Sequence, residues 1–229
     1  MSDSSDRKVR WRDRVAVIIL CGGKSSRMGY AKWRLPFGDE RMLDRILRIT
    51  REISETQIVV AARDQQIDGV PKSVRVVFDE QIDRGPLQGI HAGMLALPAT
   101  IDAAFVTSCD VPMISPAFVL RLFDLLTAEM QVVVPFEKKY HHPLAAVYRR
   151  SVLPVVSALL QADRLRPVFL FDEVETLRVP VEDLRDVDAD LDSLKNLNDA
   201  ESYLSAIQQA GFDTADIPDR VLNQITRIP

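Results

Sequence analysis

The sequence predicts an α/β fold: a single-domain, three-layer α/β/α architecture around a Rossmann-like, mostly parallel sheet. Apolar runs with little polar alternation, such as VAVIIL (15–20) and AAFVTS (103–108), are typical of strands buried on both faces. Between such runs lie longer segments with apolar residues at helical spacing, for example within 38–53. Strands that alternate with helices need crossover connections, and these connections produce parallel sheets.

The elements follow from periodicity and from their end signals. Strands are predicted over 15–20, 57–62, 74–78, 103–108, 131–135, 144–148 and 176–180, and helices within 38–53 and over 87–97, 116–128, 150–161 and 199–211. Ser115 and Pro116 fit the N-cap and first position of a helix, and Gly211 fits a helix stop.

One domain is expected, because the chain has no internal repeat and no Gly/Ser-rich linker. The predicted division is a flexible basic arm over 1–13, a catalytic domain over 14–210 and a C-terminal tail over 211–229. The tail fits a short helix packed on the body or on a partner subunit, and it equally fits a disordered segment.

Composition excludes several classes of function. Lysine and arginine total 29 against 33 aspartate and glutamate, so a net charge of -4 gives no chain-wide attraction to nucleic acid or to an anionic membrane. The N-terminus has no apolar stretch typical of a secretory signal, and no run approaches a membrane span, so a cytoplasmic location is expected. Cys21 and Cys109 lack metal-type spacing and are expected to be buried free thiols.

The loop after the first strand, LCGGKSSRMGYAK (20–32), is typical of a phosphate site. Its glycines let backbone N–H groups approach an anion, its serines add donors, and Arg27 and Lys32 add positive charge. The spacing matches neither a Walker loop nor a G-x-G-x-x-G motif. An ordinary strand-to-helix turn with solvated charges is the alternative.

Two acidic residues follow later strands. Asp110 comes directly after 103–108 and is a candidate Mg²⁺ ligand, although a turn-capping role before Pro112 fits equally well. Asp79 follows 74–78 and precedes RGPLQG, where a helix N-terminus offers free amides to an anion or a base. In an open parallel sheet both residues lie at the edge where ligands bind.

Five motifs occur together in one order: LCGGKSSRMGYAK, FDEQIDRGPLQGI, SCDVP, HHPLAAVYR and NLNDAESY. With them the sequence resembles the molybdenum cofactor guanylyltransferase family over about residues 14–208. The resemblance implies a fold of the nucleotide-diphospho-sugar transferase type and Mg²⁺-dependent transfer of GMP from GTP to molybdopterin. It implies GTP or another NTP and molybdopterin as partners, and it leaves oligomeric state and contacts with molybdoenzymes or chaperones open.

The same resemblance implies the site residues. It assigns catalytic roles to Arg27, Lys32 and Asp110, and metal binding to Asp110 and Asn198. The residues that it assigns to nucleotide binding are Leu20, Cys21, Gly22, Gly23, Ser25, Lys32, Asp79 and Asp110. The candidates for contact with the pterin are His142 and Asn198.

The sequence also departs from the family pattern. Ala31 replaces an acid before the lysine, Asp199-Ala200 replaces Thr-Pro, and Ala61-Ala62-Arg63 stands where the family has an asparagine on the nucleotide. The pair Gly22-Gly23 favours GTP, because cytidylyl relatives more often have L-A-A-G. A cytidylyltransferase of the same cofactor, another NTP:phosphate nucleotidyltransferase and a non-catalytic nucleotide-binding module are the alternatives.

Overall fold

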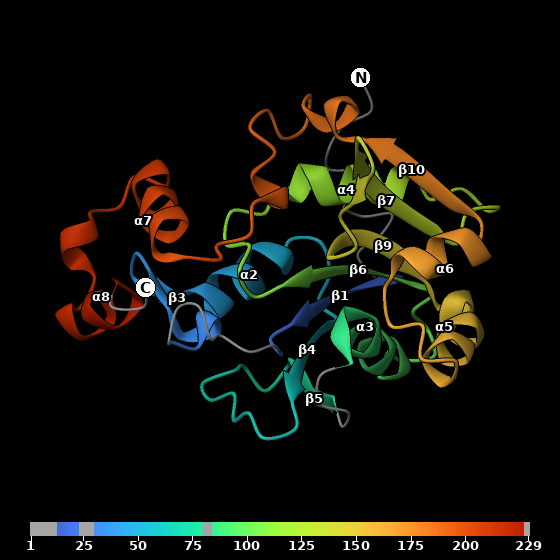
Figure 1. Cartoon of the computed structure of the whole chain (residues 1–229), viewed down its shortest axis with the longest axis horizontal. Coiled ribbons are helices and arrows are strands. Elements are labelled where there is room, and N and C mark those ends of the chain that lie inside the picture. The colour runs from blue at the N-terminus through green and yellow to red at the C-terminus, as the bar shows by residue number, and fades with distance from the viewer. Residues whose placement is uncertain (1–12, 23–29, 80–83, 227–229) are drawn as a thin grey trace.

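The structure, a computed structural model, describes residues 13–22, 30–79 and 84–226. Their main sheet has eight strands in the order β10-β7-β9-β6-β1-β4-β5, with β8 paired to β7 alone (Figure 1). The strands are β1 (Val15–Leu20), β4 (Gln57–Ala62), β5 (Arg75–Asp79), β6 (Ala103–Ser108), β7 (Val132–Glu137), β8 (Tyr140–His141), β9 (Ala145–Arg149) and β10 (Thr176–Pro180).

The main sheet is mostly parallel, as predicted. Strands β4, β5 and β6 run parallel to β1, and β10 runs parallel to β7. Strand β9 is antiparallel to both β6 and β7, because the β7–β8 hairpin returns the chain without a crossover helix. The strands other than β8 and β9 therefore end at one edge, here called the carboxyl edge.

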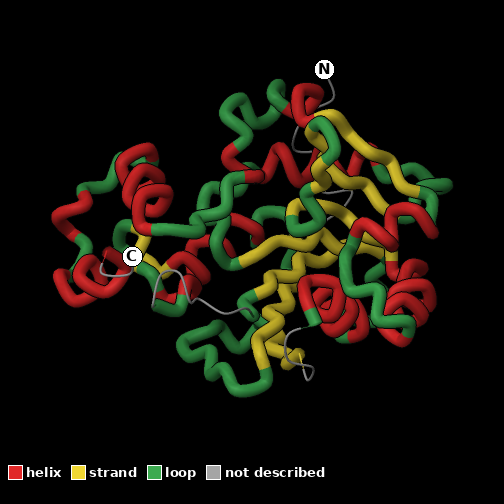
Figure 2. The backbone as a smooth tube through the Cα atoms, in the orientation of Figure 1, coloured by secondary structure: helices red, strands yellow, loops and turns green. Residues whose placement is uncertain are grey.

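Helices cover both faces of the sheet (Figure 2). The helices are α2 (Met42–Thr50), α3 (Gly85–Leu95), α4 (Pro116–Leu125), α5 (Leu153–Gln161), α6 (Val168–Glu173), α7 (Ala200–Gln209) and α8 (Asp219–Thr226). Val17 and Ile19 of β1 pack with α2 and α4, whereas Ala16 and Ile18 pack with α3, α5 and α6. This alternation along β1 places one apolar core on each side of the sheet and confirms the three-layer prediction.

The segment 38–53 is helical over a shorter stretch than its pattern indicates. The chain first forms a hairpin of β2 (Pro36–Phe37) and β3 (Glu40–Arg41), with Gly38 at a φ of 64°, and α2 then begins at Met42. The predicted helix over 116–128 ends at Leu125, the helix over 150–161 begins as a 3-10 turn, and α6 and β8 had not been predicted. The predicted cap is confirmed, because the Ser115 hydroxyl accepts the N–H of Phe118.

The hairpin β2–β3, α7 and α8 form a group at one end of the molecule (Figure 1), here called the C-terminal lobe. Phe37 and Met42 share an apolar cluster with Ile207 of α7 and Val221 of α8. Residues 219–226 of the tail are thus a helix packed on the chain itself, and the domain boundaries remain predictions. Among the described residues, no helix is long and apolar enough to cross a membrane.

Candidate functional site

The carboxyl edge holds a group of side chains that we call the Lys32 cluster: Lys32, Ser108, Asp110, Asn196 and Asn198. The ammonium of Lys32 lies 2.8 Å from Asp110 Oδ2 and 2.8 Å from Asn198 Oδ1. The other carboxylate oxygen, Asp110 Oδ1, accepts the Ser108 hydroxyl and the side-chain amide of Asn196, the latter at 2.9 Å. Both oxygens of the Asp110 carboxylate therefore accept hydrogen bonds from side chains of the cluster.

Three separate segments bring this cluster together. Asp110 lies two residues beyond the end of β6, and Lys32 begins a 3-10 turn on the path from β1 to α2. The segment before α7 crosses the carboxyl edge, where the N–H of Leu197 donates to the carbonyl of Asp110 at 2.9 Å. Asn196 and Asn198 lie on either side of that backbone contact: the Asn196 amide donates to Asp110 Oδ1, and Asn198 Oδ1 accepts from the Lys32 ammonium that also donates to Asp110 Oδ2.

Ser108 and Asn196 are site residues that the sequence did not single out. The only signal was their spacing, since each lies two positions before a predicted site residue, Asp110 and Asn198 respectively. Their function in the fold is clear from their contacts: they hold Oδ1 and leave Oδ2 directed at Lys32.

The donor set of the cluster fits a hard divalent cation. Asp110 supplies a carboxylate oxygen and Asn198 a carboxamide oxygen, both within hydrogen-bond distance of one cationic atom. No group of three or more His, Cys, Asp or Glu side chains within the described ranges is arranged to hold a metal. A single carboxylate suits Mg²⁺ in particular, because this ion usually keeps waters and binds substrate phosphates beside one or two carboxylates.

The predicted nucleotide loop begins beside this cluster. The side chains of Leu20 and Cys21 are buried in the core. A Cβ on Gly22 would lie 3.5 Å from the backbone nitrogen of Ala62, so the loop leaves β1 close against the end of β4. Gly23, Ser25 and Arg27 lie outside the described residues.

Two thiols lie beside the cluster. Cys21 and Cys109 are free and buried, as predicted. Burial, followed by the neighbouring Cys109 thiol, raises the pKa of Cys21 well above its ordinary value. A thiol that stays protonated is a poor nucleophile, so Cys21 is unsuited to covalent catalysis.

The other predicted residues lie along the same edge but on opposite sides of Asp110. Asp79 ends β5 and is paired in register with Ala62 of β4, on the β1 side of the sheet. His142 directly follows β8, in the turn before β9, and donates its backbone N–H to the carbonyl of Pro135. The sheet order therefore separates a β1–β4–β5 side from a β9–β7 side, with the Lys32 cluster between them.

Each of the three histidines has a pKa below its ordinary value, and burial is the largest cause for His91, His141 and His142. Nearby Asp79 and Glu137 oppose the shift at His91 and His142 respectively. The unfolded chain consequently binds more protons than the folded one once the pH falls through about 6.5.

Acidification from about pH 7 to about pH 5.5 should therefore lower the melting temperature, because the stability that depends on neutral histidines is lost in this window. The measurement is thermal unfolding followed by circular dichroism across that range. A variant with all three histidines changed to glutamine should lose less stability over the same interval. An unchanged pH dependence in that variant would refute the assignment.

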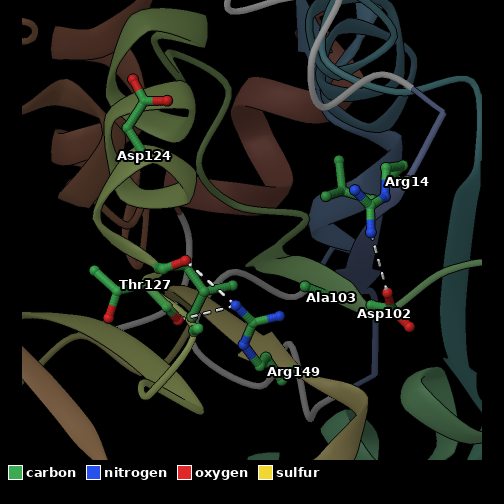
Figure 3. Close-up of a pocket in the computed structure, with 9 residues that line it drawn as sticks. Arg14, Asp102, Ala103, Asp124, Thr127 and Arg149 are labelled. Atoms are coloured by element: carbon green, nitrogen blue, oxygen red, sulfur yellow. Dashed lines mark hydrogen bonds and ion pairs between the residues drawn. The ribbon is translucent and has the colours of Figure 1, made fainter.

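A cavity of about 340 Å³ lies at the opposite edge of the sheet, at the start of β1 and β6 (Figure 3). Arg149 lines it but donates to the carbonyls of Met130 and Thr127, at 2.8 and 2.9 Å. Asp102 and Asp124 also line it, and Asp102 lies 3.8 Å from the guanidinium of Arg14, the second arginine of the lining. The carboxyl edge is favoured as the functional site by its position, because open α/β sheets bind their ligands at the carboxyl ends of the strands.

Comparison with known proteins agrees with the fold. The model of the MobA-like NTP transferase domain matches residues 17–176, which is more than half of the chain. The chain belongs to this family. The matched region of this MobA-like NTP transferase includes Lys32, Asp110 and His142, whereas Asn196 and Asn198 lie beyond it.

Two relatives of this MobA-like NTP transferase match over nearly their whole length. A protein of Methanosarcina mazei named probable molybdenum cofactor guanylyltransferase is 29% identical over 92% of this chain and 97% of its own. A molybdenum cofactor guanylyltransferase of Desulfosudis oleivorans is 31% identical over 85% of this chain and 95% of its own.

Solved structures share the architecture. Molybdopterin-guanine dinucleotide biosynthesis protein A from Archaeoglobus fulgidus superposes with a TM-score of 0.73 at 20% identity, covering 86% of this chain and 98% of its own. A 2-C-methyl-D-erythritol 4-phosphate cytidylyltransferase from Thermus thermophilus gives a TM-score of 0.61 at 13% identity, covering 86% and 99%. At such identities these likenesses establish the fold of the MobA-like NTP transferase alone.

Proposed function

We propose that this protein transfers GMP from GTP to molybdopterin, releases pyrophosphate and depends on Mg²⁺. The names of the full-length relatives support the reaction. The observation that carries the proposal is the Lys32 cluster, which combines one cation with two oxygen ligands at the edge where open α/β sheets bind nucleotides. A cytoplasmic location is part of the proposal, because the substrates named here are small intracellular molecules.

The reaction is an in-line displacement. The terminal phosphate of molybdopterin attacks the α-phosphorus of GTP, a new P–O–P bond forms, and the bond to the bridging oxygen breaks as pyrophosphate leaves. The attacking group is already an anion, so the site needs no general base. Catalysis then consists mainly of positioning and charge neutralisation.

The chain's own residues supply both. Lys32 and Arg27 stabilise the charge that grows on pyrophosphate, and the backbone amides and hydroxyl of Gly22, Gly23 and Ser25 bind phosphate oxygens. Asp110 and Asn198 would hold Mg²⁺, which supplies positive charge to the phosphate oxygens when it is bound. The oxygen ligands are already oriented before substrate arrives, because Ser108 and Asn196 fix the carboxylate of Asp110.

The two sides of the carboxyl edge suggest where the two substrates bind. Asp79 and the end of β1 lie on the β1–β4–β5 side, which we assign to GTP. His142 lies on the β9–β7 side, which we assign to the pterin. The α-phosphate would then lie next to Asp110, between the two halves.

The direct test is incubation with Mg-GTP and molybdopterin, followed by mass analysis of the product. We expect a guanine dinucleotide of molybdopterin together with an equal amount of pyrophosphate. If no combination of nucleotide and pterin gives pyrophosphate release, the result would instead support a nucleotide-binding module without catalysis.

Base selectivity needs a separate test, because Ala61 is buried and neither Ala61 nor Ala62 offers a polar side chain to a base. Thermal shift with Mg²⁺ and GTP, CTP or ATP compares the three bases directly. A specific nucleotide at a hundred times its Kd adds about 2.7 kcal/mol to the free energy of unfolding. A larger shift with CTP than with GTP would favour a cytidylyltransferase of the same cofactor.

The proposal also gives Asn196 a positioning role. Asn196→Ala removes the amide that donates to Asp110 Oδ1 at 2.9 Å, so the carboxylate gains freedom to rotate. We expect turnover to fall about tenfold, in line with the loss of one hydrogen bond to a charged group. The measurements are kcat, which should fall, and the affinity for Mg²⁺, which should weaken.

Asn223→Ala is the matched control, because Asn223 lies exposed on α8 in the C-terminal lobe. It should leave kcat and Mg²⁺ affinity unchanged. Equal behaviour of the two variants would remove Asn196 from the positioning role.

A further inference from the structure

The ammonium of Lys32 occupies the point where two oxygen ligands converge. It lies 2.8 Å from Asp110 Oδ2 and 2.8 Å from Asn198 Oδ1. The side chains of Lys32 and Asp110 are only 17% and 11% exposed. An ion pair so shielded from water is screened much less than a surface pair, so the attraction between the two charges is strong.

The same two oxygens are the ligands that the proposed function assigns to Mg²⁺. A magnesium ion binds oxygen at about 2.0–2.1 Å, which is closer than an ammonium approaches. Lys32 in its present position would therefore block access to both ligands and would repel a second cation. The lysine and a divalent cation compete for one place.

Lys32 is the mobile member of this group. Asp110 is held at Oδ1 by Ser108 and Asn196, and Asn198 directly precedes the capped start of α7, where Asp199 and Ser202 form a capping box. Lysine has a flexible four-carbon stem and a compact charge, so its ammonium can move while the two oxygen ligands stay in place.

We propose that Lys32 is an internal counter-ion that excludes free Mg²⁺ and admits the metal together with a triphosphate. The phosphates of a metal–nucleotide complex give the ammonium a new anionic partner, so Lys32 moves to them as Asp110 and Asn198 take the metal. Free metal offers no such partner and must displace the lysine without compensation. The inference rests on the proposed function and names the metal–nucleotide complex as the form of substrate that binds.

Reciprocal coupling follows from this exchange. If the triphosphate strengthens metal binding by drawing Lys32 away, then the metal strengthens triphosphate binding by the same factor. Removal of the ammonium should raise the affinity for metal alone and should reduce the coupling.

The test measures binding of Mn²⁺ alone, from the electron paramagnetic resonance signal of the free ion, to the full-length protein without nucleotide. Lys32→Met removes the charge and keeps much of the apolar stem. We expect Mn²⁺ to bind this variant at least tenfold more tightly than the wild type, and Mg²⁺ to displace it. The ratio of the Mn²⁺ Kd values without and with GTP should shrink in the variant.

Two controls separate charge from position. Lys32→Arg keeps a cation in place and should bind Mn²⁺ as weakly as the wild type. Arg34→Met removes a cation two residues away, which is paired with Asp68 at 3.0 Å, and should change nothing. Lys32→Gln serves as a second neutral variant if Lys32→Met fails to fold.

The outcomes distinguish this inference from the proposed function. Wild-type protein that binds Mn-GTP, beside a neutral Lys32 variant with no gain in Mn²⁺ affinity, would overturn the counter-ion role and leave the proposed function intact. Wild-type protein that binds neither metal nor Mn-GTP would overturn both.

Discussion

Asp110→Asn is expected to lower turnover at least a hundredfold while the fold stays intact. The change removes the negative charge that lies 2.8 Å from Lys32 and that would hold Mg²⁺. Loss of one preorganised electrostatic contact costs about 3 kcal/mol in transition-state stabilisation, which corresponds to a hundredfold or more in rate. The amide keeps the shape of the carboxylate, so the packing around it should change little.

The measurement is pyrophosphate release with Mg-GTP and molybdopterin, beside circular dichroism to confirm folding. Asp102→Asn is the matched control, because it makes the same substitution at the opposite edge of the sheet. Asp102 lies 3.8 Å from the guanidinium of Arg14 there. It should keep wild-type turnover. An Asp110→Asn variant with a near-wild-type rate would remove Asp110 from the metal and phosphate chemistry.

Lys32→Ala is expected to weaken GTP binding far more than guanosine binding. The lysine contributes its charge to the triphosphate and makes no contact that a nucleoside requires, so the loss should be about tenfold to a hundredfold for GTP alone. The measurement is isothermal titration calorimetry with Mg-GTP, GDP and guanosine. A graded loss along this series would place the ammonium at the outer phosphates.

Lys195→Ala provides the comparison, because Lys195 is exposed and pairs with Asp192 at 2.7 Å. Its removal should leave all three affinities unchanged. Equal losses for GTP and guanosine in Lys32→Ala would contradict a phosphate role and would indicate damage to the whole pocket.

The sequence predicted the central strands well because each is a short apolar run that is buried on both faces. Strand β1 is an example, since all six of its residues are buried, and its range agrees with the prediction. The sequence could not predict the direction of β9, because the apolar pattern of a buried strand is the same whether its neighbour is parallel or antiparallel. That direction depends on the tight β7–β8 hairpin, which brings the chain back beside β7.

Helix α2 is shorter than the predicted segment 38–53 for a related reason. The apolar spacing within 38–53 is helical, but the first residues of the segment pair with Pro36 and Phe37 instead. Phe212, from the C-terminal lobe, packs edge-on against Phe37 at 5.8 Å, and a Cβ on Gly38 would collide with its ring. A contact with a residue so distant in sequence leaves no local signal.

By itself, the sequence determined the fold class and the strands, because burial and periodicity are local properties of the chain. It also singled out Lys32, Asp110 and Asn198, although as members of separate motifs. Only the tertiary structure decided that these three side chains meet, that Ser108 and Asn196 hold the carboxylate, and that the ammonium lies between the two oxygen ligands. The physical reason is that parallel strands end at one edge, where a segment from residue 196 onward crosses to Asp110 through a single backbone hydrogen bond.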